Sequence, residues 1–283
     1  MDDTLKNVVF GLFSLFVIHG SLQKRVNHDA ARQVMDSFNH TGTVHTKVES
    51  RGVFGVFGNK LYSVDIMGDG LISERLPFFS TPRSGWKGSI RHLRLHLTNL
   101  TLKGLPVERF DADIPDVTYD IGQATYKDWL VIRGAGRGPG SVQIGAEGLQ
   151  TFVLRKYKKL MSEVTVEFLK EGVGISGNLN LFGKPTPFSA TGKLVTRDKR
   201  YLDLIQPKIE MNGKPVSEAL TLTILKQINP VLDIETDLGL GGYFTLERIQ
   251  FSAGHIIASG ETGIPIKLKD PIPTQSNSEP VKP

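Results

Sequence analysis

Hydrophobic and polar positions alternate strictly over six residues, 92–97, within the stretch RHLRLHLTNLTL at residues 91–102. On a strand, this alternation puts two histidines and an arginine on one face: His92, Arg94 and His96. The opposite face then carries Leu93, Leu95 and Leu97. After Asn99 the leucines resume with their phase shifted by one residue, as a β-bulge would produce. The pattern predicts a bent strand whose continuous aliphatic face needs an apolar partner.

The same stretch offers a second interpretation, because His92 and His96 are four residues apart, a metal-ligand spacing on a helix. On a strand, however, Arg94 lies between them on the same face, and its positive charge would repel a metal ion. No third ligand is offered nearby. We therefore expect a solvated strand face and no metal site.

Short alternating runs joined by glycine turns recur along the chain. Residues 164–168 and 173–175 flank the turn Glu171-Gly172, and residues 244–247 precede the turn Ala253-Gly254 and the run HIIASG. Thirty glycines and fifteen prolines punctuate such runs throughout. This spacing is typical of hairpins and predicts a mainly antiparallel sheet.

Two segments follow helical spacing instead. In residues 149–160 the apolar positions are Leu149, Phe152, Val153, Tyr157 and Leu160. In residues 217–228, Ser217 is a candidate N-cap before an apolar stripe, and Asn229-Pro230 ends the segment. Helices set against a long sheet predict an α+β fold.

The chain divides into three parts by composition. Residues 1–38 contain the uncharged run VVFGLFSLFVI at 8–18, which predicts an anchor or signal-like helix, although a span needs roughly 20 apolar residues. Residues 39–268 form one domain without a linker, and residues 269–283 are predicted to be disordered. Acids precede the apolar run and basic residues follow it, which favours a cytoplasmic body by the positive-inside rule.

Chemical motifs are scarce. The chain has no cysteine, and its net charge of +5 suits an anionic surface. The glycines of GAGRGPG at 134–140 predict a mobile loop, because a proline stands where a dinucleotide motif needs its third glycine. The acids between Glu108 and Asp120 lack calcium-loop spacing and predict a solvated strand face. We expect no catalytic residue, no metal and no cofactor.

Five successive stretches carry a resemblance to a known family: EGLQTFVLRKY, VTVEFLKEGVGISGNL, TPFSATGKLVTRDKRYLDLIQPKIEMNGKPV, SEALTLTILKQINP and GGYFTLERIQFSAGHIIASGE. Their order resembles the LmeA-like phospholipid-binding proteins of the bacterial envelope, most clearly over residues 145–261. The resemblance implies a non-enzymatic protein that binds anionic phospholipid. It also implies a long curved sheet wrapped around two or more helices, similar to tubular lipid-binding domains. It places the body at the cell envelope on the extracytoplasmic side, whereas the charge pattern leaves the cytoplasmic membrane face open.

The functional hypothesis is that phospholipid acyl chains bind in an apolar groove, and carriage of the bound lipid is an extension of this hypothesis. The candidate groove residues are Leu93, Leu95, Leu97, Phe152, Leu220, Ile224 and Phe244. One alternative is a membrane-tethered structural or scaffolding envelope protein whose leucines only fill a core. A third class is a hydrolase whose site is assembled from distant residues, which a polar pocket with a converging histidine and acid would favour.

Two further surfaces are predicted to meet the membrane. The loop LPFFSTPRSGW at 76–86 offers aromatic side chains for the bilayer interface: Phe78, Phe79 and Trp86. The first helix offers cations for anionic headgroups: Arg155, Lys156, Lys158 and Lys159. Nucleic acid is not an expected partner, because the patch lacks interleaved aromatic residues. The sequence does not specify an oligomeric state.

Overall fold

The computed structural model describes residues 31, 34–36, 38, 40–50, 60–82, 85–121, 131–170, 172–181, 184–252 and 254–266. The apolar run at 8–18 and the tail at 269–283 lie outside these residues, so both assignments stay predictions.

Strands from the first and last parts of the described chain build a nine-stranded sheet with the main order β1-β2-β4-β5-β7-β15-β14. These strands are β1 (Thr43–Ser50), β2 (Lys60–Asp69), β4 (Lys87–Leu102), β5 (Leu105–Asp120), β7 (Gly138–Gly145), β15 (His255–Thr262) and β14 (Phe244–Ser252). Two short strands complete it: β3 (Ile72–Ser73) beside β4, and β6 (Ile132–Gly134) beside β5. The pairs β2–β4 and β3–β4 are parallel and the others are antiparallel.

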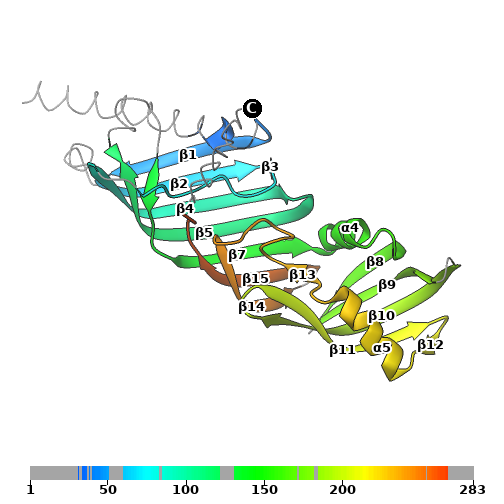
Figure 1. Cartoon of the computed structure of the whole chain (residues 1–283). Coiled ribbons are helices and arrows are strands. Elements are labelled where there is room, and N and C mark those ends of the chain that lie inside the picture. Colours follow the sequence, from blue (N-terminus) through cyan, green and yellow to red (C-terminus); the bar gives the residue numbers. More distant parts are fainter. Residues whose placement is uncertain are drawn as a thin grey trace, which may run out of the picture.

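A six-stranded antiparallel sheet forms the other half, with the main order β12-β11-β10-β9-β8. Its strands are β8 (Met161–Leu169), β9 (Gly172–Leu181), β10 (Lys184–Arg197), β11 (Tyr201–Met211), β12 (Lys214–Pro215) and β13 (Leu232–Asp233). The two sheets lie side by side along an elongated molecule (Figure 1). The hairpins predicted at 164–175 and 244–260 are confirmed as β8–β9 and β14–β15.

Both predicted helices are present. Helix α4 (Ala146–Lys156) links the nine-stranded sheet to β8, and α5 (Glu218–Ile228) lies over the six-stranded sheet on the same side as α4 (Figure 1). Ser217 is the N-cap of α5, and its side chain accepts a hydrogen bond from the Leu220 amide at 3.4 Å. The α+β class is confirmed. The chain divides its strands between two sheets, and the wrapping of a sheet around helices stays a prediction.

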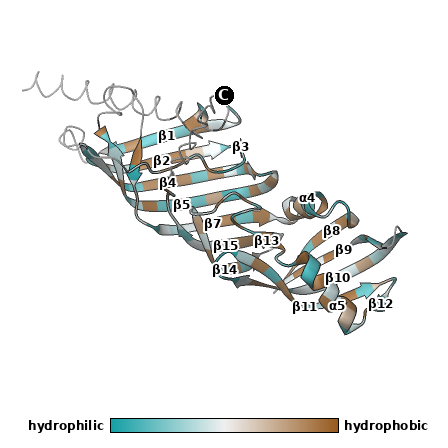
Figure 2. Ribbon diagram, in the orientation of Figure 1, coloured by the Kyte–Doolittle hydropathy of each residue, from teal (hydrophilic) through white to brown (hydrophobic). Residues whose placement is uncertain are grey.

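Strand β4 has the two faces that its sequence predicts. Leu93, Leu95 and Leu97 are at most 2% exposed, whereas His96 on the other face is exposed. Hydrophobic and hydrophilic residues alternate along β4 and β5 in Figure 2. The predicted phase shift is also present, and Asn99 has a φ of 50° there. The predicted β-bulge, which would leave one extra residue unpaired, is not the cause of this phase shift. The buried positions of β5 shift by one residue at the same level, and the β4–β5 register stays continuous.

The prediction of a mobile loop at 134–140 is wrong for most of its glycines, because they belong to strands. Gly138 and Gly140 belong to β7 and pair with Thr262 and Ala112 in the two neighbouring strands. A Cβ atom on Gly138 would lie 2.0 Å from the backbone oxygen of Asp113. These glycines therefore allow close approach of β7 to β5, and residues 135–137 alone connect β6 to β7.

Candidate functional site

The inner face of the six-stranded sheet is apolar and incompletely covered. Residues directly opposite each other in paired strands share a face, so the pairs Ala190–Ile175 and Phe188–Met211 identify this side. Ala190 and Phe188 are buried, but Ile175 and Met211 are only partly buried. Helix α5, which crosses this side, contributes further partly buried residues: Ile224, Leu225 and Ile228. We call this surface, made by the inner side of β8–β11 together with α5, the half-covered face.

Helix α5 is rich in apolar residues, yet none of its side chains is fully buried. Leu220 is 37% exposed and Leu222 is 53% exposed. By contrast, α4 buries Leu149, Phe152 and Val153 in the core. An amphipathic helix normally buries its apolar stripe, so α5 leaves apolar area available for another apolar partner.

The predicted groove residues do not form one surface. Leu220 and Ile224 lie on α5 at the half-covered face. The three leucines of β4 are enclosed in the other half of the molecule (Figure 1), and Phe152 and Phe244 are 2% and 4% exposed in the core. The role of these five residues as groove lining stays a prediction.

A small, wholly apolar cavity lies where the two sheets meet. Its volume is about 20 Å³, and its lining includes Leu149 of α4, Leu202 of β11, and Phe244 and Leu246 of β14. The segment 231–238, which follows α5, supplies further lining residues. Ligand pockets typically occupy about 300–1,000 Å³, so this cavity holds no acyl chain in its present shape.

A hydrogen bond joins the ends of the two helices beside the half-covered face. The Tyr157 hydroxyl, just after α4, donates to the Ile228 carbonyl at 2.9 Å. Burial, and then the negative charge of Asp237, raise the pKa of Tyr157 to about 12. The hydroxyl therefore remains a hydrogen-bond donor at neutral pH.

The four predicted headgroup cations have different environments. Lys156 Nζ lies 2.6 Å from an Asp237 carboxylate oxygen, and the Arg155 guanidinium lies over the Phe152 ring at 5.7 Å. Lys158 and Lys159 are exposed and have no ion-pair partner among the described residues. Two of the four cations are thus free to meet a ligand, and Lys156 has a structural role.

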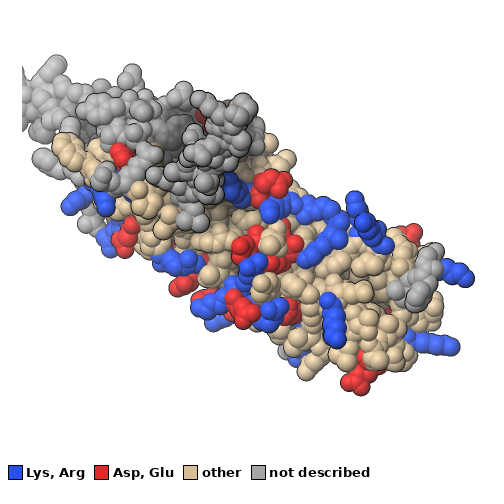
Figure 3. Space-filling view, viewed as in Figure 1, with Lys and Arg blue, Asp and Glu red and all other residues tan. Residues whose placement is uncertain are grey.

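Positive charge is concentrated in the half of the molecule that contains α5. Residues 146–228 contain thirteen lysines and arginines and eight acids, a net charge of +5 that equals that of the whole chain. In Figure 3, a broad uncharged surface covers the region of α5 and the six-stranded sheet, and lysines and arginines project at its margins. Apolar surface bordered by cations suits a molecule with apolar chains and an anionic headgroup.

The predicted membrane-contact loop has one prominent side chain. Trp86 is 83% exposed. Phe78 and Phe79 are partly buried against the core, where Phe79 makes an edge-to-face contact with Tyr243 at 5.7 Å between ring centroids. In this arrangement Trp86 alone of the three is available to a bilayer.

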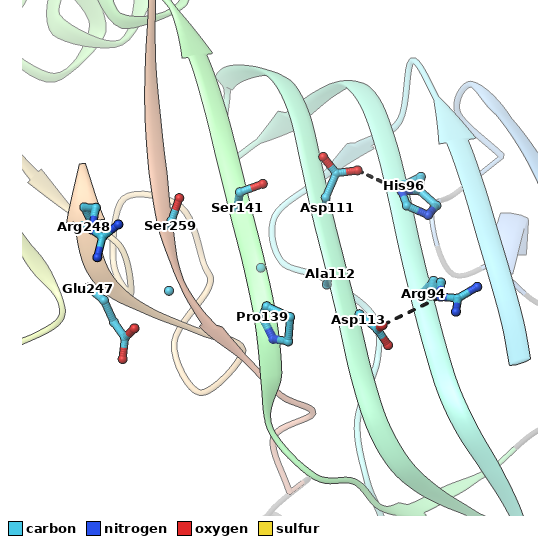
Figure 4. A pocket seen from close by; sticks show the side chains of 12 residues that line it. Arg94, His96, Asp111, Ala112, Asp113, Pro139, Ser141, Glu247, Arg248 and Ser259 are labelled. Atoms are coloured by element: carbon cyan, nitrogen blue, oxygen red, sulfur yellow. Dashed lines mark hydrogen bonds and ion pairs between the residues drawn. The ribbon is translucent and has the colours of Figure 1, made fainter. Parts of the chain in front are cut away.

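A polar cleft of about 710 Å³ lies on the outer side of the nine-stranded sheet, which is the side opposite the buried leucines of β4 (Figure 4). The sequence did not predict this cleft. His96 Nδ1 lies 2.8 Å from Asp111, and just outside the cleft lining His92 Nδ1 lies 3.1 Å from Asp113. The spacing of residues within single strands could not predict this cleft, because its lining residues come from β4, β5, β7, β14 and β15, which include strands far apart in the sequence.

The order of side chains across this cleft bears on hydrolytic chemistry. Asp111 pairs with His96 on one side and with Ser141 on the other, so the carboxylate lies between the imidazole and the hydroxyl (Figure 4). His96 and Ser141 are two strand spacings apart, roughly 10 Å. A base must lie about 2.6–3.2 Å from the nucleophile that it activates. The arrangement places an acid where a serine hydrolase needs its histidine.

The described residues contain neither a membrane-spanning helix nor a metal site. None of the helices in that part of the chain is long and apolar enough to cross a membrane. Within the same residues, no group of three or more histidines and acids is placed to hold a metal ion.

Comparison with known proteins gave one match. The sequence model of the family described as LmeA-like phospholipid-binding matches residues 85–261. The matched segment runs from the start of β4 to the end of β15 and includes α4, α5 and the whole six-stranded sheet. Neither the curated proteins nor the solved structures yielded a match.

The raised pKa of Tyr157 predicts a loss of stability in alkali. The unfolded chain releases this proton near pH 10, whereas the folded protein keeps it until about pH 12. Below pH 10 both states are protonated, and between pH 10 and 12 the free energy of unfolding falls by at most about 1.4 kcal/mol per pH unit. Urea unfolding of wild type and Tyr157→Phe across this range measures the effect. Equal slopes in the two proteins would contradict the assignment.

Proposed function

The chain belongs to the LmeA-like phospholipid-binding family, and from this membership we propose that it holds phospholipid acyl chains against the half-covered face. The observation that carries the proposal is α5, an apolar helix with no fully buried side chain over a sheet face that is itself only partly covered. Each acyl CH₂ that leaves water contributes about 0.8 kcal/mol, and the exposed leucines gain a partner at the same time.

The headgroup is proposed to lie beside the end of α4. Lys158 and Lys159 are exposed in the short turn between α4 and β8, near the Tyr157 contact with α5. A cation near an anionic lipid surface contributes about 1 kcal/mol, which salt screens. This position supports a preference for anionic phospholipid.

We propose further that the protein acts without enzymatic chemistry, carrying or presenting lipid at the bacterial cell envelope. Family membership supports the envelope assignment. The order histidine, acid, serine across the polar cleft weighs against the hydrolase alternative. A scaffolding role without lipid remains the competing function, and detection of bound lipid distinguishes the two.

The exposed leucines of α5 supply the first test. Native mass spectrometry after exposure to phosphatidylglycerol vesicles should detect wild type with bound lipid. The double variant Leu220→Ser, Leu222→Ser should lose lipid occupancy at least about tenfold, because apolar contact area is removed from a site that contributes little to the core. Ile72→Ser is the matched control, since Ile72 is 55% exposed on the other sheet. Full occupancy in the double variant would reject α5 as part of the site.

The free lysines supply the second test. Lys158→Gln with Lys159→Gln should weaken binding to anionic vesicles about tenfold or more at low salt, leave binding to neutral vesicles unchanged, and flatten the salt dependence. Lys156 is kept, because its loss would break the contact with Asp237. Lys60→Gln with Lys87→Gln, two exposed positions on the nine-stranded sheet, is the matched control. Vesicle co-sedimentation over a salt series measures all three proteins. An unchanged salt slope in the first variant would show that these lysines only solvate the turn.

A further inference from the structure

Residues 229–243 connect α5 to β14 and close the interior between the two sheets; we call them the strap. The strap alternates between two kinds of side chain. Leu232, Ile234 and Leu238 are at most 5% exposed and line the apolar cavity. The acids that alternate with them are Asp233, Glu235 and Asp237.

Ion pairs attach the strap to its surroundings. Arg200, in the turn between β10 and β11, donates through Nε and a terminal nitrogen to the two Asp233 oxygens at 2.8 and 2.7 Å. The same guanidinium lies 2.5 Å from Glu235, and Lys156 of α4 lies 2.6 Å from Asp237. The pairing with Arg200 holds the pKa of Asp233 far below its usual range, so the Asp233–Arg200 pair is charged at neutral pH.

We call the side chains of Leu232, Ile234 and Leu238 the plug. The ion pairs that hold the strap and the plug differ in the free energy that their release costs. Arg200 and Lys156 are partly solvent-exposed, so water can hydrate both charges when the pairs open. The three apolar side chains fill space lined only by apolar atoms, which an acyl chain can fill equally well. An acyl chain that replaces these side chains therefore keeps the apolar lining out of water, and the exchange costs the exposure of the three displaced side chains. The strap joins β14 through Gly239 and Gly242, which have φ values of 67° and 75° and lie where the backbone must turn.

We propose that the strap occupies an acyl-chain site: phospholipid displaces Leu232, Ile234 and Leu238 and takes their place between the two sheets. This inference rests on the proposed function and extends it. The half-covered face receives the lipid, and the space beneath the strap holds the inner part of its chains. The cavity of about 20 Å³ is the part of this site that stays empty while the strap is in place.

A reversible cross-link tests the displacement. Tyr201 and Asp233 are directly paired between β11 and the strap, and the chain has no cysteine of its own. Paired positions in antiparallel strands suit disulfide geometry, so Tyr201→Cys with Asp233→Cys should lock the strap when oxidised and free it when reduced. Neither residue lines the cavity. Ser176→Cys with Ser189→Cys, a pair on the exposed side of β9 and β10, is the control disulfide.

The measurement is uptake of a phospholipid with a fluorescent acyl chain from phosphatidylglycerol vesicles. The oxidised lock should slow uptake at least about tenfold relative to its reduced form, and the control pair should respond equally in both states. Equal uptake by the oxidised and reduced lock would overturn the strap as a displaced plug and leave the proposed function standing. No uptake by wild type would overturn both.

If the protein with the cysteine pair does not fold, a second variant tests the displacement of the strap. Arg200→Gln removes the pairs with Asp233 and Glu235 without changing the cavity lining, and should raise the uptake rate about tenfold. Arg197→Gln is the matched control, because Arg197 also pairs with two acids and stacks on Tyr201 but forms no ion pair with the strap among the described residues. Identical uptake rates for the two variants would overturn the proposal.

Discussion

The burial of two apolar sheet faces by a small number of covering elements is the constraint on which this structure depends. Each sheet turns one apolar side to a shared interior, and in the described residues α4, α5 and the strap close the interior of the six-stranded half. Helix α4 buries Leu149, Phe152 and Val153, whereas α5 has no fully buried side chain. The nine-stranded half is more fully enclosed, as the β4 leucines show. Among the described residues, the half-covered face lies at one end of an elongated molecule, and lipid binding is proposed there.

Charge reinforces this division. On the outer side of the nine-stranded sheet, Arg94 and Arg109 pair with acids of β2 and β5, so that this surface carries both signs in close contact. The six-stranded half has an excess of cations, some of which hold the strap while others remain free beside the end of α4. The same electrostatic rules thus serve two purposes: paired charges fix the covering elements, and unpaired charges attract an anionic ligand.

Sequence patterns predicted the elements better than their assembly. Strict alternation identified β4, β8 and β14, and the serine N-cap and helical spacing identified α5, because these signals act over a few neighbouring residues. The division into two sheets, the strap and the polar cleft depend on residues far apart in the chain, and periodicity carries no information about such pairings. The glycines of β7 were assigned to a loop because only the structure reveals the backbone of β5 against them. Alternation of acids and aliphatic residues in 231–238 was a usable signal for the strap, but it is too short to distinguish from an ordinary strand.

Photo-cross-linking with a phosphatidylglycerol that carries a diazirine in its acyl chain tests the central claim most directly, since it reports where the chain lies. After irradiation and digestion, the account predicts label on α5, the strap and the inner side of β8–β11, and no label on the residues that line the outer polar cleft, such as His96 and Asp111. Labelling confined to peptides of the nine-stranded sheet, or an absence of label despite lipid in the vesicles, would contradict it.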